Sequence, residues 1–149
     1  MSIGFADTLD LRRPASLDFY RPQSLVDPND PGQRTIRSAP DSVEEWVTWH
    51  REHPYLEVSE PKPVTVGGVS GVQIDSATSS VPEGASSLAM WIYDSGSQIR
   101  NVKEARGRTI ILEVEGDTLL TGVRAGGTNN VEKPFSRARE VLDTAQWSS

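Results

Sequence analysis

The clearest pattern of hydrophobic and polar positions has the spacing of a helix and begins near Asp41. Apolar residues recur at intervals of three and four, as on one helix face: Val43, Trp46, Val47 and His50, with Trp49 widening the face. Asp41 is expected to be the N-cap because its carboxylate can accept hydrogen bonds from first-turn amides, and Glu44 completes a capping-box pattern. Pro54 disfavours helical geometry at His53, so the predicted helix ends there.

After Pro54 the spacing of apolar residues changes to two, the period of a strand. The alternating positions are Leu56, Val58, Val64, Val66, Val72 and Ile74. Gly67-Gly68 interrupts them at a point suited to a tight turn, so a hairpin with one buried face is predicted. Residues 88–93 are apolar on both faces, which favours a central strand.

Two more elements are predicted in the second half of the chain. Apolar runs at residues 108–114 and 118–123 flank Glu115-Gly116-Asp117 and predict a second hairpin. A stripe of apolar residues then predicts a C-terminal helix: Phe135, Ala138, Val141, Leu142 and Ala145. Shorter strands are expected around residues 17–19, 35–37 and 99–102.

The order of these elements predicts an α+β fold: a mostly antiparallel sheet flanked by two main helices. The strands and helices do not alternate as in βαβ units. A chain of 149 residues has the length of one domain, so residues 1–149 are expected to form a single α+β domain. Residues 1–16 are expected to be a loosely ordered N-terminal segment, because prolines interrupt their short apolar stretches.

Charge and composition restrict the classes of partner. The net charge of −6 disfavours nucleic acid, whose binding depends on clustered Lys and Arg. No apolar run approaches the roughly 20 residues of a membrane-spanning helix, so direct membrane insertion is not expected. The absence of cysteine excludes disulfides and thiolate chemistry. The first residues do not have the pattern of a signal peptide, which predicts a cytoplasmic protein unless an export segment has been removed.

Several motifs together resemble a known kind of domain. They are the helix ending in His53-Pro54, PVTVGGVSGVQID, LAMWIYDSG, RTIILEVEGDTLLTGVRA and PFSRAREVLDTAQW, which fall within residues 17–147. They are similar to a poorly characterised extracytoplasmic domain of actinobacterial secreted and lipoprotein-type proteins, which more distantly resembles the PsbP-like sandwich. The resemblance implies an extracytoplasmic binding or accessory role without known catalytic residues. Such domains often carry paired cysteines where this chain has SSVPEGASS.

Asp94-Ser95-Gly96 follows the apolar strand at residues 88–93, as in aspartic proteases. That chemistry requires two carboxylates that share a proton, and the sequence holds no second copy of the motif. A turn at the end of the strand is therefore the preferred interpretation. An aspartic-type hydrolase that uses Asp94 is the least favoured alternative.

Other candidate sites are explained better as parts of the fold. His50 and His53 lack the spacing of a metalloprotease helix. His50 is expected at the edge of the core, and His53 is expected to cap the last helical carbonyls, where the helix dipole favours a cation. Ser70 lacks the second glycine of a nucleophile elbow, and the glycine-rich segments lack a phosphate-binding lysine. Asp27 and Asp30 lie in a turn-rich segment without the ligand spacing of a calcium loop. No catalytic residue, cofactor or metal site is predicted.

The aromatic residues provide the remaining hypotheses. Most tryptophans are expected in the core, but Trp49, Tyr55 and Trp147 are candidates for a partner surface, since aromatic residues are enriched at interface hot spots. The predicted function is a non-catalytic binding or accessory domain that acts through protein–protein interaction. The alternative is a small hydrophobic ligand held between sheet and helix, in a pocket lined by residues such as Trp46, Trp91 and Leu112.

Overall fold

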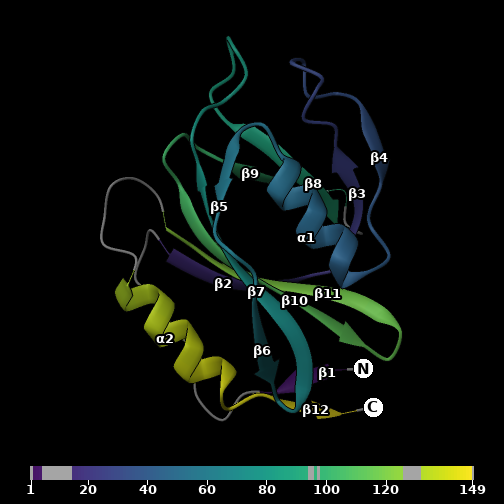
Figure 1. Ribbon diagram of the computed structural model, residues 1–149, viewed down its shortest axis with the longest axis vertical. Helices are drawn as coiled ribbons and strands as arrows, with labels where there is room; N and C mark the ends of the chain where they lie inside the picture. Colours follow the sequence, from purple (N-terminus) through teal and green to yellow (C-terminus); the bar gives the residue numbers. More distant parts are fainter. Residues whose placement is uncertain (1, 5–14, 94–95, 97, 126–131, 149) are drawn as a thin grey trace.

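Two main β-sheets and two helices make up the chain in the computed structural model, which describes residues 2–4, 15–93, 96, 98–125 and 132–148 (Figure 1). The helices are α1 (Val43–Glu52) and α2 (Glu132–Leu142). The strands are β1 (Ser2–Gly4), β2 (Ala15–Tyr20), β3 (Pro22–Val26), β4 (Ile36–Ser38), β5 (Leu56–Val58), β6 (Lys62–Val66), β7 (Val69–Thr78), β8 (Leu88–Tyr93), β9 (Gln98–Asn101), β10 (Arg106–Val114), β11 (Asp117–Ala125) and β12 (Gln146–Ser148). Every described strand pair is antiparallel, so the predicted α+β class is confirmed.

The larger sheet has the strand order β2-β11-β10-β7-β5, and β6 pairs with β7 beside β5. β7 is long enough for its first half to pair with β6 and its last residues with β5. The smaller sheet has the order β4-β3-β8-β9, and β1 pairs with β12 in a two-stranded ribbon. The apolar strand at residues 88–93 is internal in the smaller sheet, as its sequence predicts.

Both predicted hairpins are present and have two-residue turns. Gly67 and Gly68 have φ values of 57° and 82°, and they connect β6 to β7. Glu115 and Gly116 have φ values of 53° and 84°, and they connect β10 to β11. Turns with two positive φ values match the right-handed twist of paired strands, which explains the glycines at these positions.

Two cores lie on opposite faces of the larger sheet. Alternation along β10 sends Ile111 to one face and Ile110 and Leu112 to the other. Ile111 packs with α1 and the smaller sheet, in a core that contains Trp46, Trp49, Trp91, Leu25, Leu88 and Met90. The other face is covered by α2, through Leu142 and the following Ala145. Figure 1 shows α1 and α2 on these two sides.

Helix α1 begins one residue later than its sequence predicts. Ser42, not Asp41, is the N-cap: its backbone is extended, and its hydroxyl oxygen accepts a 3.2 Å hydrogen bond from the amide of Glu45. The Glu45 carboxylate in turn accepts from the amide of Asp41 at 3.1 Å. The capping contacts therefore use Ser42 and Glu45 in place of Asp41 and Glu44, and the Glu45 carboxylate binds the amide before the N-cap residue where a capping box would use the N-cap amide itself. The end of α1 before Pro54 and the buried positions of Trp46, Trp49 and His50 are confirmed.

Two strands of the fold come from the N-terminal part of the chain. Ser2–Gly4 forms β1 and pairs with β12, a contact that the sequence pattern does not predict, and β2 begins at Ala15. Residues 5–14 lie outside the described ranges. No helix within the described ranges is long and apolar enough to cross a membrane.

Candidate functional site

Four connecting segments meet at one end of the molecule, which we call the loop end. It consists of the β3–β4 loop (residues 27–35), the α1–β5 turn (residues 53–55), the β7–β8 loop (residues 79–87) and the β9–β10 turn (residues 102–105). The strand pairings bring these segments together, because the last residues of β7 pair with β5 and β10, while Leu88 of β8 pairs with Asn101 of β9. The β3–β4 and β7–β8 loops project at the top of Figure 1.

Gln33 connects two of these loops. Its side-chain amide donates a 3.0 Å hydrogen bond to the carbonyl of Ser87, and its side-chain oxygen accepts from the amide of Ala89. Gln33 has a φ of 54°, a left-handed conformation that is unfavourable for a residue with a Cβ atom. The contacts with Ser87 and Ala89 compensate for this strain, so the side chain is held in place across the two loops.

Asp30 organises the β3–β4 loop from within. Its carboxylate accepts hydrogen bonds from the amides of Gly32, Arg34 and Thr35 and from the Thr35 hydroxyl. These bonds, led by those from Thr35, lower the pKa of Asp30 to about 2. The turn interpretation of this segment agrees with the observed contacts, and a charged Asp30 keeps the loop in one shape.

The other segments of the loop end are joined by backbone hydrogen bonds. The amide of Ser79 donates to the carbonyl of Tyr55 at 2.9 Å, and the amide of Glu104 donates to the carbonyl of Thr78 at 2.8 Å. Arg100 reaches back to the β7–β8 loop, where its Nε donates to the Ser87 hydroxyl at 2.8 Å. Hydrogen bonds therefore connect the segments of the loop end to one another.

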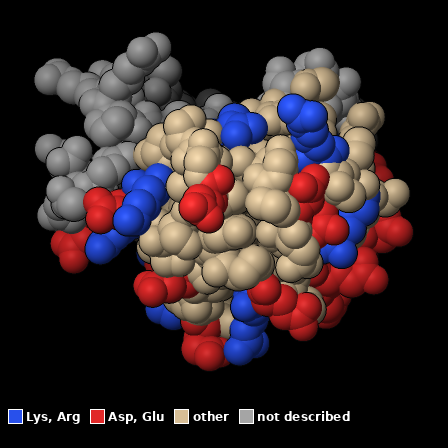
Figure 2. Space-filling view, turned by 90° about the horizontal axis from the view of Figure 1, so that it is seen from above, with Lys and Arg blue, Asp and Glu red and all other residues tan. Residues whose placement is uncertain are grey.

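The loop end also carries exposed apolar side chains. Ile36, at the start of β4, and Val102, directly after β9, are 54% and 52% exposed, and they are the exposed large hydrophobic residues of the described chain. Figure 2 views the molecule from this end and shows mostly uncharged residues in the centre, with many Asp, Glu, Lys and Arg side chains around the periphery. Ile36 and Val102 lie where the sequence predicts only short strands beside turns.

A cluster of tryptophan and histidine rings lies in the core near the loop end. Trp49 contacts His50, His53 and Trp91 edge to face, with ring centroids 4.9, 5.0 and 6.0 Å apart. His50 and His53 are only 1% and 3% exposed. Nε1 of Trp49 and Nε2 of both histidines are buried and have no hydrogen-bond partner among the described residues. Such unpaired groups are uncommon in folded proteins, so this cluster is a notable feature of the core.

Burial determines the protonation of both histidines. Burial, opposed by a hydrogen bond with the carbonyl of Trp46, lowers the pKa of His50 to about 4. Burial and the neighbouring His50 lower the pKa of His53 to about 4. His53 was expected to act as a cation beside the last carbonyls of the helix; instead it is neutral near pH 7, and its Nδ1 accepts a 3.2 Å hydrogen bond from the amide of Tyr55. The capping N–H comes from the His53 backbone, which donates to the carbonyl of His50.

The three residues considered for a partner surface lie in different places. Trp49 is 7% exposed within the ring cluster. Tyr55 is half-buried in the α1–β5 turn of the loop end, with its ring 6.1 Å from that of His53. Trp147 lies on β12, where it pairs with Ile3; its side chain is outside the described part of the structure. Tyr55 is thus the member of this set that belongs to the loop end.

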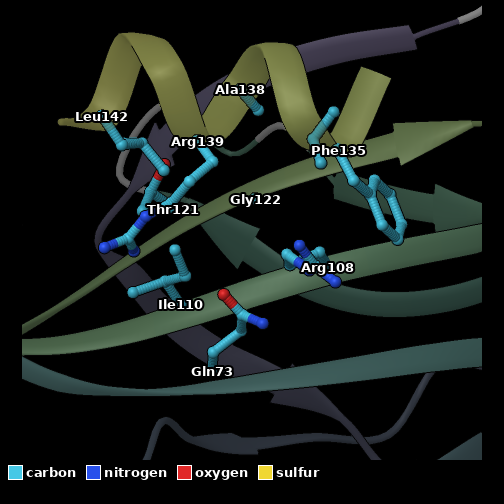
Figure 3. A pocket seen from close by; sticks show the side chains of 10 residues that line it. Gln73, Arg108, Ile110, Thr121, Gly122, Phe135, Ala138, Arg139 and Leu142 are labelled. Carbon is cyan, nitrogen blue, oxygen red and sulfur yellow. The ribbon is translucent and has the colours of Figure 1, made fainter. Parts of the chain in front are cut away.

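The residues considered for a ligand pocket are also separated. Trp46 and Trp91 lie in the core beside α1, whereas Leu112 lies in the core beside α2. The space between α2 and the sheet measures about 10 Å³ and is bordered by Phe135, Ala138 and Leu142 (Figure 3). Pockets for small molecules typically measure roughly 300–1,000 Å³. The contact between α2 and the sheet is thus a filled core at this point.

Arg108 joins the larger sheet to α2 beside this space. Its Nε and Nη2 donate to the two carboxylate oxygens of Asp75 at 2.8 and 3.0 Å. Its guanidinium also lies over the ring of Phe135, 4.7 Å from the centroid. The paired geometry is the strong form of an Arg–carboxylate contact, and it fixes Arg108 as part of the interface between the sheet and α2.

The structure describes some of the remaining candidate residues. Asp94 lies outside the described residues, so the aspartic-type hydrolase stays a hypothesis from sequence. Ser70 is exposed on β7, where it pairs with Thr65 in a hairpin. Among the described residues no three His, Asp or Glu side chains are grouped closely enough to hold a metal ion. Comparison of the chain with family models, curated proteins and solved structures found no match.

Proposed function

We propose that the chain is a non-catalytic domain that binds a protein partner through its loop end. The observation that carries the proposal is that the loops are connected through Gln33 while Ile36 and Val102 stay exposed beside them. Loops held on a rigid scaffold are frequent binding elements. Loops already fixed in one shape lose less conformational entropy on binding, so more of the contact energy contributes to affinity.

The spacing of the exposed side chains fits one interface. Ile36 lies on β4 and Val102 directly after β9, at opposite edges of the four-stranded sheet. Three strand spacings separate these edges, or roughly 14 Å at about 4.8 Å per strand. A typical interface covers about 800 Å² on each partner, so both side chains lie within the area of one partner. Tyr55 of the same end belongs to the proposed surface.

The enclosed spaces support a macromolecular partner over a small hydrophobic ligand. Within the described part of the chain, two small cavities between the elements measure about 10 and 20 Å³, and two open grooves measure about 410 Å³ each. An apolar small molecule gains most from an enclosed pocket. The resemblance to extracytoplasmic actinobacterial domains likewise implies a binding or accessory role.

Photo-crosslinking from defined positions tests the proposal. A photoreactive amino acid placed at position 36 or 102 is expected to capture the same protein, and the same probe at Thr65 is expected not to capture it. Thr65 is a matched control because it is exposed on β6, beside the turn at the opposite end of the sheet. Equal capture of that protein from Thr65 would contradict the proposal.

Binding of the purified partner gives the quantitative test. The substitutions Ile36→Asp and Val102→Asp are each expected to weaken binding at least about tenfold, because they place a charge in an apolar contact. Thr65→Asp is expected to leave the affinity within about twofold, as is usual for residues outside an interface. Unchanged affinity in both loop-end variants would rule out this surface.

A further inference from the structure

A small cavity lies beneath the loop end, between α1, the smaller sheet and the larger sheet. Its volume is about 20 Å³, and its lining includes polar residues from five elements: His50, Ser76, Asn101, Arg106, Thr109 and Arg124. A single water needs roughly 10–15 Å³ and two to four polar partners. The cavity is thus large enough for one water and polar enough to hold it.

The contacts of His50 determine which of its ring nitrogens can accept a hydrogen bond. Nδ1 lies 2.8 Å from the carbonyl oxygen of Trp46. A carbonyl oxygen can only accept, so Nδ1 carries the hydrogen. His50 is 1% exposed, and its pKa of about 4, lowered by burial, keeps the ring neutral near pH 7. Nε2 is therefore a bare acceptor, and it has no hydrogen-bond partner among the described residues.

Asn101 contributes a second acceptor to the same cavity. Its Oδ1 is buried and likewise has no partner among the described residues. Two acceptors cannot form a hydrogen bond with each other, whereas one molecule with two donor hydrogens can satisfy both. Each buried acceptor left unsatisfied costs about 1–3 kcal/mol. Water is the smallest neutral molecule that donates two hydrogen bonds.

We propose that this cavity binds one water molecule, which donates one hydrogen bond to Nε2 of His50 and the other to Oδ1 of Asn101. The water connects α1 with β9, and so joins the helix to the edge of the smaller sheet directly below the loop end. Ser76 and Thr109 line the same cavity and provide hydroxyl groups beside the water. The walls also include the buried residues Trp91 and Met90.

A high-resolution crystal structure of the full chain tests the position of the water. The expected result is one water within hydrogen-bond distance of both His50 Nε2 and Asn101 Oδ1. Nitrogen NMR of the His50 ring is expected to show a protonated Nδ1 and an unprotonated Nε2. A cavity without a water in contact with both atoms, or a hydrogen on Nε2, would overturn the proposal.

The variant Asn101→Leu tests the role of the second acceptor in solution. The wild-type protein is expected to show magnetisation transfer from a long-lived water to the His50 ring, and Asn101→Leu is expected to lose it. Asn29→Leu is the matched control, because Asn29 is exposed in the β3–β4 loop, and it should keep the signal. If Asn101→Leu does not fold, Asn101→Ala provides the same comparison. Persistence of the unchanged signal in the folded variant would contradict the proposed site.

Discussion

The side-chain oxygen of Gln33 accepts a hydrogen bond from the backbone amide of Ala89, 56 residues later in the chain. Ala89 is 1% exposed, so water cannot replace this acceptor easily. The contact joins the β3–β4 loop to the start of β8, in the interior of the smaller sheet. Gln33 therefore determines how the two loops lie relative to each other.

The substitution Gln33→Ala is expected to lower the free energy of unfolding by about 1–3 kcal/mol, because it leaves the buried Ala89 amide without its acceptor. Urea denaturation measures the loss, and hydrogen exchange should become faster at Ala89. Gln23→Ala is a matched control, since Gln23 is exposed on β3, and it should change stability by less than about 0.5 kcal/mol. Similar losses in the two variants would show that the bond to Ala89 contributes little.

The N-cap of α1 gives a second prediction. Ser42→Ala is expected to destabilise the protein by about 1 kcal/mol, because the hydroxyl that accepts from Glu45 is removed. Asp41→Ala should cost about half as much, since this carboxylate contributes only a favourable charge near the start of the helix. Thermal and urea unfolding of both variants measure the difference. A larger loss for Asp41→Ala would indicate that the helix begins at Asp41 in solution.

Stability is expected to fall as the pH decreases from about 6.5 towards 4, because of His50. In the unfolded chain His50 has its ordinary pKa of 6.5, whereas in the folded protein the pKa is about 4. Between these values the unfolded chain binds more protons, so acid favours unfolding, and the stabilisation is complete only above pH 6.5. Complete protonation of His50 lowers the free energy of unfolding by about 3 kcal/mol.

The surroundings of His50 strengthen this expectation. His53, the C-cap directly after α1, has a pKa lowered in the same direction, while Arg106 and Arg124 of the larger sheet line the cavity beside His50. The described lining contains no carboxylate that could stabilise a protonated His50 ring. Urea denaturation from about pH 7 to about pH 4.5 measures how the free energy of unfolding depends on pH. The substitution His50→Phe is expected to make this dependence weaker. If the free energy of unfolding depended on pH equally in the wild-type protein and in the His50→Phe variant, the assignment to His50 would be contradicted.

Gly71 gives a prediction about close packing. A Cβ atom at this position would overlap the carbonyl oxygen of Ile111 and the side chain of Leu112. Gly71→Ala is therefore expected to destabilise the protein by about 1–3 kcal/mol. Gly107→Ala on β10 is the control, because its nearest heavy atom would be 3.4 Å away, and a loss below about 1 kcal/mol is expected. If urea denaturation showed the same loss of free energy of unfolding for Gly71→Ala and Gly107→Ala, the predicted overlap would be contradicted.

Much of the fold could be predicted from local patterns. The alternation around Gly67-Gly68 and Glu115-Gly116 predicts both hairpins, because the side-chain period and the positive φ values are determined within a few residues. The buried face of α1 follows from helical spacing in the same way. The N-cap at Ser42 was missed, since adjacent Asp and Ser residues suit the cap almost equally well.

The candidate site depends on contacts that no local pattern encodes. Gln33 lies in a turn-rich segment, and its partner Ser87 is 54 residues away. Asn101 ends a short strand, and its relation to His50 arises only when α1 packs against the smaller sheet. His53 was expected to be charged because the helix dipole favours a cation there, but its burial outweighs that effect. Such positions follow from the packing of distant elements.

The pairing of β1 with β12 brings the two ends of the described chain together, which determines where a label or support can be joined to the protein. Ser2 pairs with Ser148, so the two ends of the described chain lie side by side, and Figure 1 places them at the opposite end from the β3–β4 and β7–β8 loops. A tether at either terminus would therefore be attached at the end of the molecule opposite the loop end, which carries Ile36 and Val102. Fusion partners, surface supports and dyes can be joined to either terminus with the same geometry, and the loop end stays accessible in each case.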